Sequence, residues 1–237
     1  MHVRLRLCSF PHALLKLSDC SQVSDGGSAL LLCSEAGLLA SSLRRSDAVE
    51  LLCSSTRTCS LYDAPDDLTC LSTCASAASS AYAEAKVSAC DMDVAEVHDC
   101  FTISELMMYE ALQLCPPGSA ARMLRAHETD LSGRIPVNTG GGLVGFGHPV
   151  GATGVKQVVE VWRQMKGKCG EYQLKRIPQL GVCANMGGEF ECSRFAYSAT
   201  FYVCVQIITL VRRGRPHCGG IHFAQLLVNS GAIVQFS

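Results

Sequence analysis

Apolar and polar positions follow two different periods along the chain, and these periods predict a mixture of strands and helices. Residues 94–98 alternate small or apolar with polar side chains, as a half-buried strand does. A turn signal, Ser24-Asp25-Gly26-Gly27, precedes a short apolar run of strand length. We expect a loop at 54–69 and strands at residues 29–33, 48–53, 94–98, 179–185 and 200–211.

Three segments have helical patterns. Residues 71–86 are rich in Ala and contain few breakers, which favours a helix by propensity. Between Thr102 and Pro116, apolar side chains recur at three- and four-residue intervals. A third apolar stripe covers residues 155–165 and stops at Gly167, a residue that commonly follows a helix. Because predicted strands and helices alternate, the sequence indicates an α/β fold.

The longest apolar run does not have the composition of a membrane span. It covers residues 196–211 and contains Ser198, Thr200, Gln206 and Thr209. A helix that crosses a bilayer needs about 20 predominantly apolar residues. The β-branched and aromatic content of this run favours a buried strand instead, so we expect no membrane span.

Charge and composition narrow the classes of partner. The chain has 237 residues, 48% of them apolar, so it can bury a substantial core. Its 20 basic and 21 acidic residues nearly cancel, and the largest basic cluster is the short run 212–215. The chain therefore lacks the excess of positive charge that proteins use to bind nucleic acid or an anionic membrane. We expect the partner to be a small molecule or another protein chain.

The 15 cysteines do not form a pattern typical of disulfides or of zinc. Their number is odd, they are scattered along the chain, and no secretory signal precedes them, so we interpret them as reduced thiols. No Cys-x-x-Cys occurs, and Cys70 and Cys74 have no second pair to complete a tetrahedral site. We therefore expect no bound metal. Basic residues before Asp19 hint at a transit peptide, and targeting stays open.

Two local motifs could carry chemistry. His98 and Cys100 occupy alternate positions at the end of the strand predicted at 94–98, so they could line one pocket or lie in the core. Thr102 and Glu105 fit a capping box, and the helix start they predict could depress the pKa of the Cys100 thiol.

The second motif is a Gly-dense stretch at 134–154, which lacks the spacing of a P-loop or of a dinucleotide-binding loop. Its His148, between Gly147 and Pro149, could be a general base, a hydrogen-bond donor or a structural residue.

Taken together, these sequence motifs resemble those of the thiolase family in their order and spacing. The resemblance rests on Asp93-Val-Ala-Glu-Val-His-Asp-Cys-Phe101 with Glu105-Leu106, on Val137-Asn138 and Gly141-Gly142-Leu143, and on Gly147-His-Pro-Val-Gly-Ala-Thr-Gly154. The tetrad His98-Asp99-Cys100-Phe101 is similar to the sterol carrier protein X branch, where most other thiolases have Asn-Glu-Ala-Phe. Residues 17–26 also resemble that branch, and the whole resemblance covers about residues 17–203.

The resemblance implies the fold of a thiolase C-terminal half, a mixed β-sheet with helices packed on it. We expect four parts: an unassigned segment at 1–16, a remnant of the N-terminal half and connecting region at 17–90, a C-terminal domain at 91–203, and an atypical extension at 204–237. The family's nucleophilic cysteine has no counterpart before Leu17, and none of Cys8, Cys20 or Cys33 lies in a similar setting. We therefore expect the isolated chain to be inactive.

The implied activity is that of an acyl-CoA C-acyltransferase in lipid, fatty-acid or sterol side-chain metabolism. Thiolases cleave a 3-oxoacyl-CoA with free coenzyme A, or run the reverse Claisen condensation, without a bound cofactor. By the family's pattern, His148 activates the nucleophilic thiol and donates to the thioester oxygen, His98 supplies a second donor, and Cys100 shuttles the proton. The resemblance places three further residues near the pocket: Gly147, Asn185 and Gly187.

A second class of function stays open, a non-catalytic thiolase-like protein that binds CoA thioesters or another subunit. In either class we expect exposed apolar surface to promote association, with a second copy or with a complementary thiolase half. The resemblance implies an intracellular protein of a peroxisome-like organelle, a mitochondrion or the cytoplasm. In the match to the branch, Ala184-Asn185 stands where the branch has His-Asn, and Cys183 is then a strand thiol.

Overall fold

The computed structural model describes residues 16–41, 44–59, 67–187, 204–213 and 224–227. Its centre is one sheet in the strand order β1-β6-β2-β5-β4-β3. Within the described residues, the strands are β1 (Leu31–Ser34), β2 (Val49–Cys59), β3 (Val94–Glu96), β4 (Leu180–Gly187), β5 (Cys204–Arg213) and β6 (Ala224–Leu227).

The sheet is mixed. The short edge strand β3 runs parallel to β4, whereas β5 pairs antiparallel with both β4 and β2 over almost its whole length. At the other end, β6 lies between β1 and β2 and is antiparallel to both. The α/β class with a mixed sheet, expected from the sequence, is confirmed.

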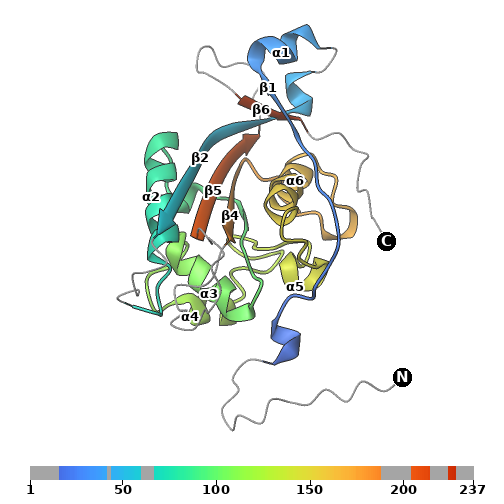
Figure 1. The fold of residues 1–237 in the computed structure, drawn as a ribbon. Coiled ribbons are helices and arrows are strands. Elements are labelled where there is room, and N and C mark those ends of the chain that lie inside the picture. Colours follow the sequence, from blue (N-terminus) through green and yellow to red (C-terminus); the bar gives the residue numbers. More distant parts are fainter. Residues whose placement is uncertain (1–15, 42–43, 60–66, 188–203, 214–223, 228–237) are drawn as a thin grey trace, which may run out of the picture.

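Helices cover both faces of this sheet. Figure 1 shows α2 on one face and α6 on the other, with α3 and α4 at the end of the sheet that also carries α5. The described helices are α1 (Glu35–Ala40), α2 (Ser72–Ala85), α3 (Thr102–Ala111), α4 (Ala120–Arg125), α5 (Gly142–Phe146) and α6 (Thr153–Met165), with short 3₁₀ turns at Leu17–Asp19, Arg45–Asp47, Ala89–Asp91 and Gly170–Tyr172.

Strand β4 lies between two hydrophobic cores, and its successive side chains point alternately into one core and the other. Val182 and Ala184 point into the core under α2 and α3, while Cys183 points into the core under α6. Successive side chains of a strand face opposite sides of the sheet, so this buried strand contributes to both layers. Consequently, the next residue in the alternation, Asn185, lies on the α6 side.

The two faces hold their helices by different means. Helix α2 buries Ala77, Ala78 and Ala81, small side chains that let its backbone approach the sheet closely. Helix α6 is strongly amphipathic and buries large side chains, including Trp162 and Met165. It packs across Gly181 of β4, where an added Cβ would lie 2.5 Å from Cγ1 of Val161. The absence of a side chain at this glycine therefore sets how closely α6 lies on the sheet.

Some expected boundaries are wrong. Strand β2 continues to Cys59, so residues 54–59 are strand and not loop, because β5 pairs with them along their length. Strand β3 ends at Glu96, two residues before His98. Helix α3 ends at Ala111, well before Pro116.

The expected strand at 200–211 is described only from Cys204 onward, where β5 begins. In the described part of the chain, no helix is long and apolar enough to cross a membrane.

We predict that Gly181→Ala destabilises the fold by roughly 1–3 kcal/mol, because the new methyl group overpacks the contact between β4 and α6. Gly187→Ala, at the end of the same strand, is the matched control, since no atom of the described residues lies within 4 Å of its added Cβ. Urea unfolding of both variants measures the difference. Equal stabilities for the two variants would contradict the packing described here.

Candidate active site

The tetrad lies in the loop that follows β3. His98 is 4% exposed and Asp99 is 3% exposed, so both side chains are removed from bulk water. The strand ends before them, so the alternation argument that put His98 and Cys100 on one face does not hold. The loop is instead fixed by Asn138, whose Oδ1 accepts a hydrogen bond from the Val97 N–H at 2.8 Å.

The predicted capping box is also wrong. Helix α3 begins at Thr102 with Phe101 as its N-cap, and no side chain caps it. Glu105, the expected partner of Thr102, instead accepts a hydrogen bond from the Tyr109 hydroxyl at 2.5 Å, one turn along the same helix. A buried tyrosine hydroxyl needs a hydrogen-bond partner. The Glu105 carboxylate is that partner for Tyr109, so it does not cap the start of the helix.

Asp99 brings the tetrad and the glycine-rich loop together. Its Oδ1 accepts a hydrogen bond from the Leu143 N–H at 2.7 Å, across 44 positions of sequence. The contact is so close that a Cβ on Gly142 would lie 2.2 Å from Oδ2 of Asp99, and Gly142 has a φ of +63°. Both conditions require glycine. Sequence reasoning had assigned no task to Asp99, although its place in the tetrad was a signal.

The segment 20–26 lies over both motifs and ties them together. The Ser21 N–H donates to the Cys100 carbonyl at 2.8 Å, and the His148 N–H donates to Ser24 Oγ at 3.2 Å. At Gly147, φ is +94° and an added Cβ would lie 2.5 Å from Ser24 Oγ. Figure 1 shows this segment, in blue, running past α5. Residues from three distant parts of the chain therefore form one site.

The two histidines face each other at the centre of this site. The ring centroids of His98 and His148 are 4.9 Å apart, and the rings are nearly perpendicular, at 88°. Burial lowers the pKa of His98 to about 3, and the neighbouring His148 adds to the effect. Burial also lowers the pKa of His148, although the carboxylate of Asp99 opposes this shift. Both rings are therefore neutral at pH 7.

A threonine determines which nitrogen of His148 carries the proton. Thr153 Oγ1 donates its one hydrogen to the Pro149 carbonyl at 3.0 Å and lies 2.7 Å from His148 Nδ1. Since the hydroxyl proton is already used, the oxygen accepts from Nδ1–H. The lone pair of neutral His148 is then on Nε2, as a general base requires. Sequence reasoning missed Thr153, which opens helix α6.

The expected pocket residues occupy different places. Asn185 lies beside His98, with its Nδ2 3.1 Å from His98 Nδ1. Gly187 is exposed at the end of β4. Ala184, where the branch has a histidine, faces the core under α2 and not the His98 side. This departure from the branch therefore removes no group from the surroundings of the two rings.

Cys100 is half-buried and lies, in sequence, between His98 and the start of helix α3. Burial raises the pKa of its thiol, and the Ser104 hydroxyl and nearby backbone N–H groups oppose the shift without reversing it. The expectation that the helix start depresses this pKa is wrong, because desolvation of the thiolate outweighs the helix N-terminus. Cys100 is a protonated thiol at neutral pH, able to donate a proton.

A buried carboxyl group lies just before the tetrad. Glu96 is 0% exposed, and its Oε2 is 3.8 Å from Lys156 Nζ. Burial raises the pKa of Glu96 to about 8, and the attraction of Lys156 only partly offsets the cost of desolvation. The carboxyl group is therefore largely protonated at neutral pH.

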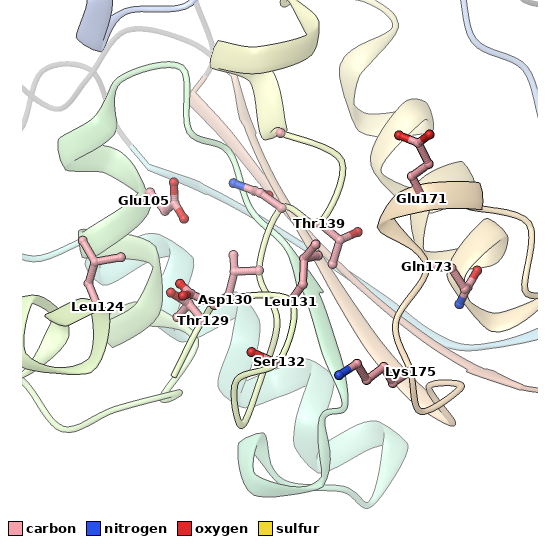
Figure 2. A pocket seen from close by; sticks show the side chains of 13 residues that line it. Glu105, Leu124, Thr129, Asp130, Leu131, Ser132, Thr139, Glu171, Gln173 and Lys175 are labelled. Carbon is pink, nitrogen blue, oxygen red and sulfur yellow. The ribbon is translucent and has the colours of Figure 1, made fainter. Parts of the chain in front are cut away.

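A hollow of about 710 Å³ lies beside the loops of this site and is lined in part by Asn138 and Gly141. Figure 2 shows Glu105, Thr139 and Lys175 around it, contributed by different segments. Neither site histidine lines it, nor does Cys100. Among the described residues, no group of three or more His, Cys, Asp or Glu side chains is placed to hold a metal ion.

We predict that the free energy of unfolding falls as pH rises from about 4.3, the ordinary pKa of Glu, towards about 8, the raised pKa of Glu96. In this window the folded state binds the proton that the unfolded state has lost, so stability decreases by at most ~1.4 kcal/mol per pH unit. Glu96→Gln should remove this slope, while Glu128→Gln at the surface should keep it. Urea unfolding across pH 5–8 measures both; equal slopes in Glu96→Gln and wild type would contradict the assignment.

Known proteins share sequence with much of this chain. A family model described as "Thiolase C-terminal domain-like" matches residues 54–196. An acetyl-CoA acetyltransferase of Methanothermobacter thermautotrophicus is 36% identical over 174 residues, which cover 73% of this chain and 45% of that protein. Sterol carrier protein 2 of Homo sapiens is 35% identical over 168 residues, 68% of this chain and 30% of that protein. The chain therefore spans less than half the length of either relative.

A solved structure shares the fold at a lower identity. The "Ltp2-ChsH2(DUF35) aldolase" has a TM-score of 0.52 and 18% identity, over 68% of this chain and 39% of that chain. This likeness concerns the fold alone. The family model covers the tetrad, the glycine-rich loop and Asn185, which the structure brings into one site. The chain belongs to the thiolase family, whose C-terminal domain it contains.

Proposed function

We propose that this chain carries the half of a thiolase site that binds the thioester oxygen and moves the proton. The observation that carries the proposal is the pair of neutral imidazoles, His98 and His148, 4.9 Å apart at their centroids. Hydrogen-bond donors held in a site away from water stabilise a developing oxyanion strongly. The substrate is a 3-oxoacyl-CoA, coenzyme A is the co-substrate, and the chain needs no bound cofactor for this chemistry.

The reaction assigns one task to each group. A cysteine thiol loses its proton to Nε2 of His148, and the thiolate attacks the 3-oxo carbonyl carbon. The bond between C2 and C3 breaks, its electron pair forms the enolate of acetyl-CoA, and the thiol of Cys100 protonates that carbon. The thiol of coenzyme A then gives its proton to the Cys100 thiolate and attacks the acyl carbon. The enzyme cysteine leaves as a thiolate and takes its proton back from His148. His98, with Nε2–H of the protonated His148, stabilises the thioester oxygen while it carries negative charge.

We propose that the nucleophilic cysteine comes from a complementary thiolase half. Apolar side chains flank the site: Phe146 and Val150 lie on either side of His148 in sequence, and Val150 is 79% exposed. Val23, next to the Ser24 that contacts His148, is also fully exposed. Exposed apolar groups around a buried polar centre are typical of a protein interface. This surface suits either a complementary half or a second copy of the chain.

The same surface favours the alternative function, a non-catalytic protein that binds CoA thioesters or a subunit. The two functions differ in whether Cys100 and the histidines move protons. We propose the catalytic function because burial keeps both rings neutral and Thr153 orients His148 as a base, features that simple binding does not require. CoA thioesters are intracellular metabolites, so we place the protein inside the cell, in a peroxisome-like organelle, a mitochondrion or the cytoplasm.

A complementation assay tests the proposal. We expect the chain alone, incubated with acetoacetyl-CoA and coenzyme A, to show no covalent acyl adduct by mass spectrometry and no thiolysis. Adding the N-terminal half of the Methanothermobacter acetyl-CoA acetyltransferase should give both, with the adduct on the cysteine of that half. His98→Ala should lower the rate by about 10²–10³, and Cys100→Ala by about 10²–10⁴.

Cys90→Ala is the matched control, because Cys90 is an exposed cysteine. It should leave the rate unchanged. A complex that forms but gives no turnover would favour the non-catalytic alternative. Turnover that is unaffected by His98→Ala and Cys100→Ala would contradict the proposed roles.

A further inference from the structure

A line of three hydrogen-bonded side chains runs from helix α6 to His98. Gln157 of α6 is fully buried, and its side chain contacts both the Ala184 carbonyl and Asn185. Asn185 in turn contacts His98. We propose that Gln157 is a positioning residue that, through Asn185, fixes the proton of His98 on Nε2. This inference rests on the proposed function and deepens it, since it names what makes His98 a donor.

The orientation of Gln157 is determined by a backbone group. Its side chain lies 3.1 Å from the Ala184 carbonyl. A carbonyl oxygen can only accept, so the amide group of Gln157 must present its NH₂ there. Its other atom, Oε1, then points to Asn185. Because Ala184 lies within strand β4, its carbonyl group is held by the sheet and does not rotate.

The orientation of Asn185 follows from that of Gln157. Gln157 Oε1 can only accept, so the Asn185 atom 3.1 Å away must be Nδ2. The same Nδ2 lies 3.1 Å from His98 Nδ1. The NH₂ group has two hydrogens, one for each partner. His98 Nδ1 therefore accepts a hydrogen bond and carries no proton, and a neutral imidazole must then hold its proton on Nε2.

One turn of α6 thus sets the roles of both histidines. Thr153 and Gln157 are four residues apart, on the same face of the helix. Thr153 accepts from Nδ1–H of His148 and leaves Nε2 as a base. Gln157, through Asn185, directs a donor to Nδ1 of His98 and leaves Nε2–H as a donor. Two neighbouring neutral rings thereby receive opposite tautomers.

A merely structural role for Gln157 predicts a different result. A buried glutamine whose groups are all satisfied also stabilises the fold, and its replacement costs stability for that reason alone. Gln164 provides the comparison: it is equally buried on α6, and it bonds to Thr139 and to the backbone of Tyr172 and Leu174. The readout must therefore report the proton of His98 and not stability.

Nitrogen NMR of the whole chain supplies that readout. With ¹⁵N-labelled histidine, long-range ¹H–¹⁵N correlations distinguish a protonated from an unprotonated ring nitrogen, and His98→Ala identifies the signals. At pH 7 we expect wild-type His98 to show one tautomer, with Nε2 protonated. Gln157→Leu should release the Asn185 amide and produce a mixture that includes Nδ1–H. Gln164→Leu should keep the single Nε2–H tautomer.

Asn185→Asp reverses the hydrogen bond to His98 Nδ1, the last step of the relay from Gln157 through Asn185 to His98. A carboxylate next to Nδ1 accepts its proton, so this variant should move the signal to Nδ1–H and raise the pKa of His98. It also keeps the test decisive if Gln157→Leu does not fold. Wild-type His98 protonated on Nδ1, or a folded Gln157→Leu protein with an unchanged tautomer, would overturn the inference.

The measurement needs no substrate, so the two proposals fail separately. An Nε2–H tautomer that depends on Gln157, together with no acyl transfer in the complementation assay, would support the relay and count against the proposed function. Acyl transfer that depends on His98, together with a tautomer independent of Gln157, would support the function and overturn the relay.

Discussion

The site depends on the carboxylate of Asp99, which is buried between two segments that lie far apart in the sequence. It accepts from the Leu143 N–H and lies against the α-carbon of Gly142, so the glycine-rich loop can approach the tetrad only where no side chain intervenes. Burying a carboxylate is costly unless hydrogen bonds satisfy it, and burial raises the pKa of Asp99 for this reason. This contact therefore holds the glycine-rich loop, which carries His148, against the loop that carries His98.

Desolvation gives the site its chemical character. The same burial that keeps both histidines neutral also keeps the thiol of Cys100 and the carboxyl of Glu96 protonated. In neutral rings each nitrogen either donates or accepts, so neighbouring hydrogen-bonding groups decide what each ring can do. Helix α6 provides these groups from two residues one turn apart, and Gly181 lets that helix lie close on β4. The packing of the fold and the proposed chemistry therefore share one interface.

The sequence predicted the local features well and the long-range ones poorly. The alternating pattern before His98 and the stripe of α6 report nearest neighbours in the chain. Both elements are present, although β3 ends at Glu96, two residues earlier than expected. The expected strand at 48–53 was shorter than β2, because residues 54–59 have a polar pattern. These residues are strand because they pair with β5, which lies more than 140 residues later in the chain. The motifs pointed to His98 and His148, but the contacts of Asp99, Thr153 and Gln157 depend on how three segments meet.

The capping box and the pKa of Cys100 failed for a related reason. Both expectations followed from sequence position at a helix start, where an unburied carboxylate and an exposed thiol would behave as predicted. In the folded chain Glu105 has a tyrosine partner, and burial outweighs the helix N-terminus at Cys100. The sequence alone did not show how far the side chains of these two residues are removed from water.

The central claim, that His98 donates its Nε2–H to a thioester oxygen, has a direct spectroscopic test. The carbonyl stretch of [1-¹³C]acetyl-CoA can be measured by isotope-edited infrared difference spectroscopy on the chain saturated with this ligand. A donor held against the oxygen away from water weakens the carbonyl bond, so we predict a band at lower wavenumber than in water. The band should return towards the solution value in His98→Ala and stay in place in Cys90→Ala, which changes an exposed cysteine. A bound thioester whose band is the same in the wild type and in His98→Ala would contradict the account.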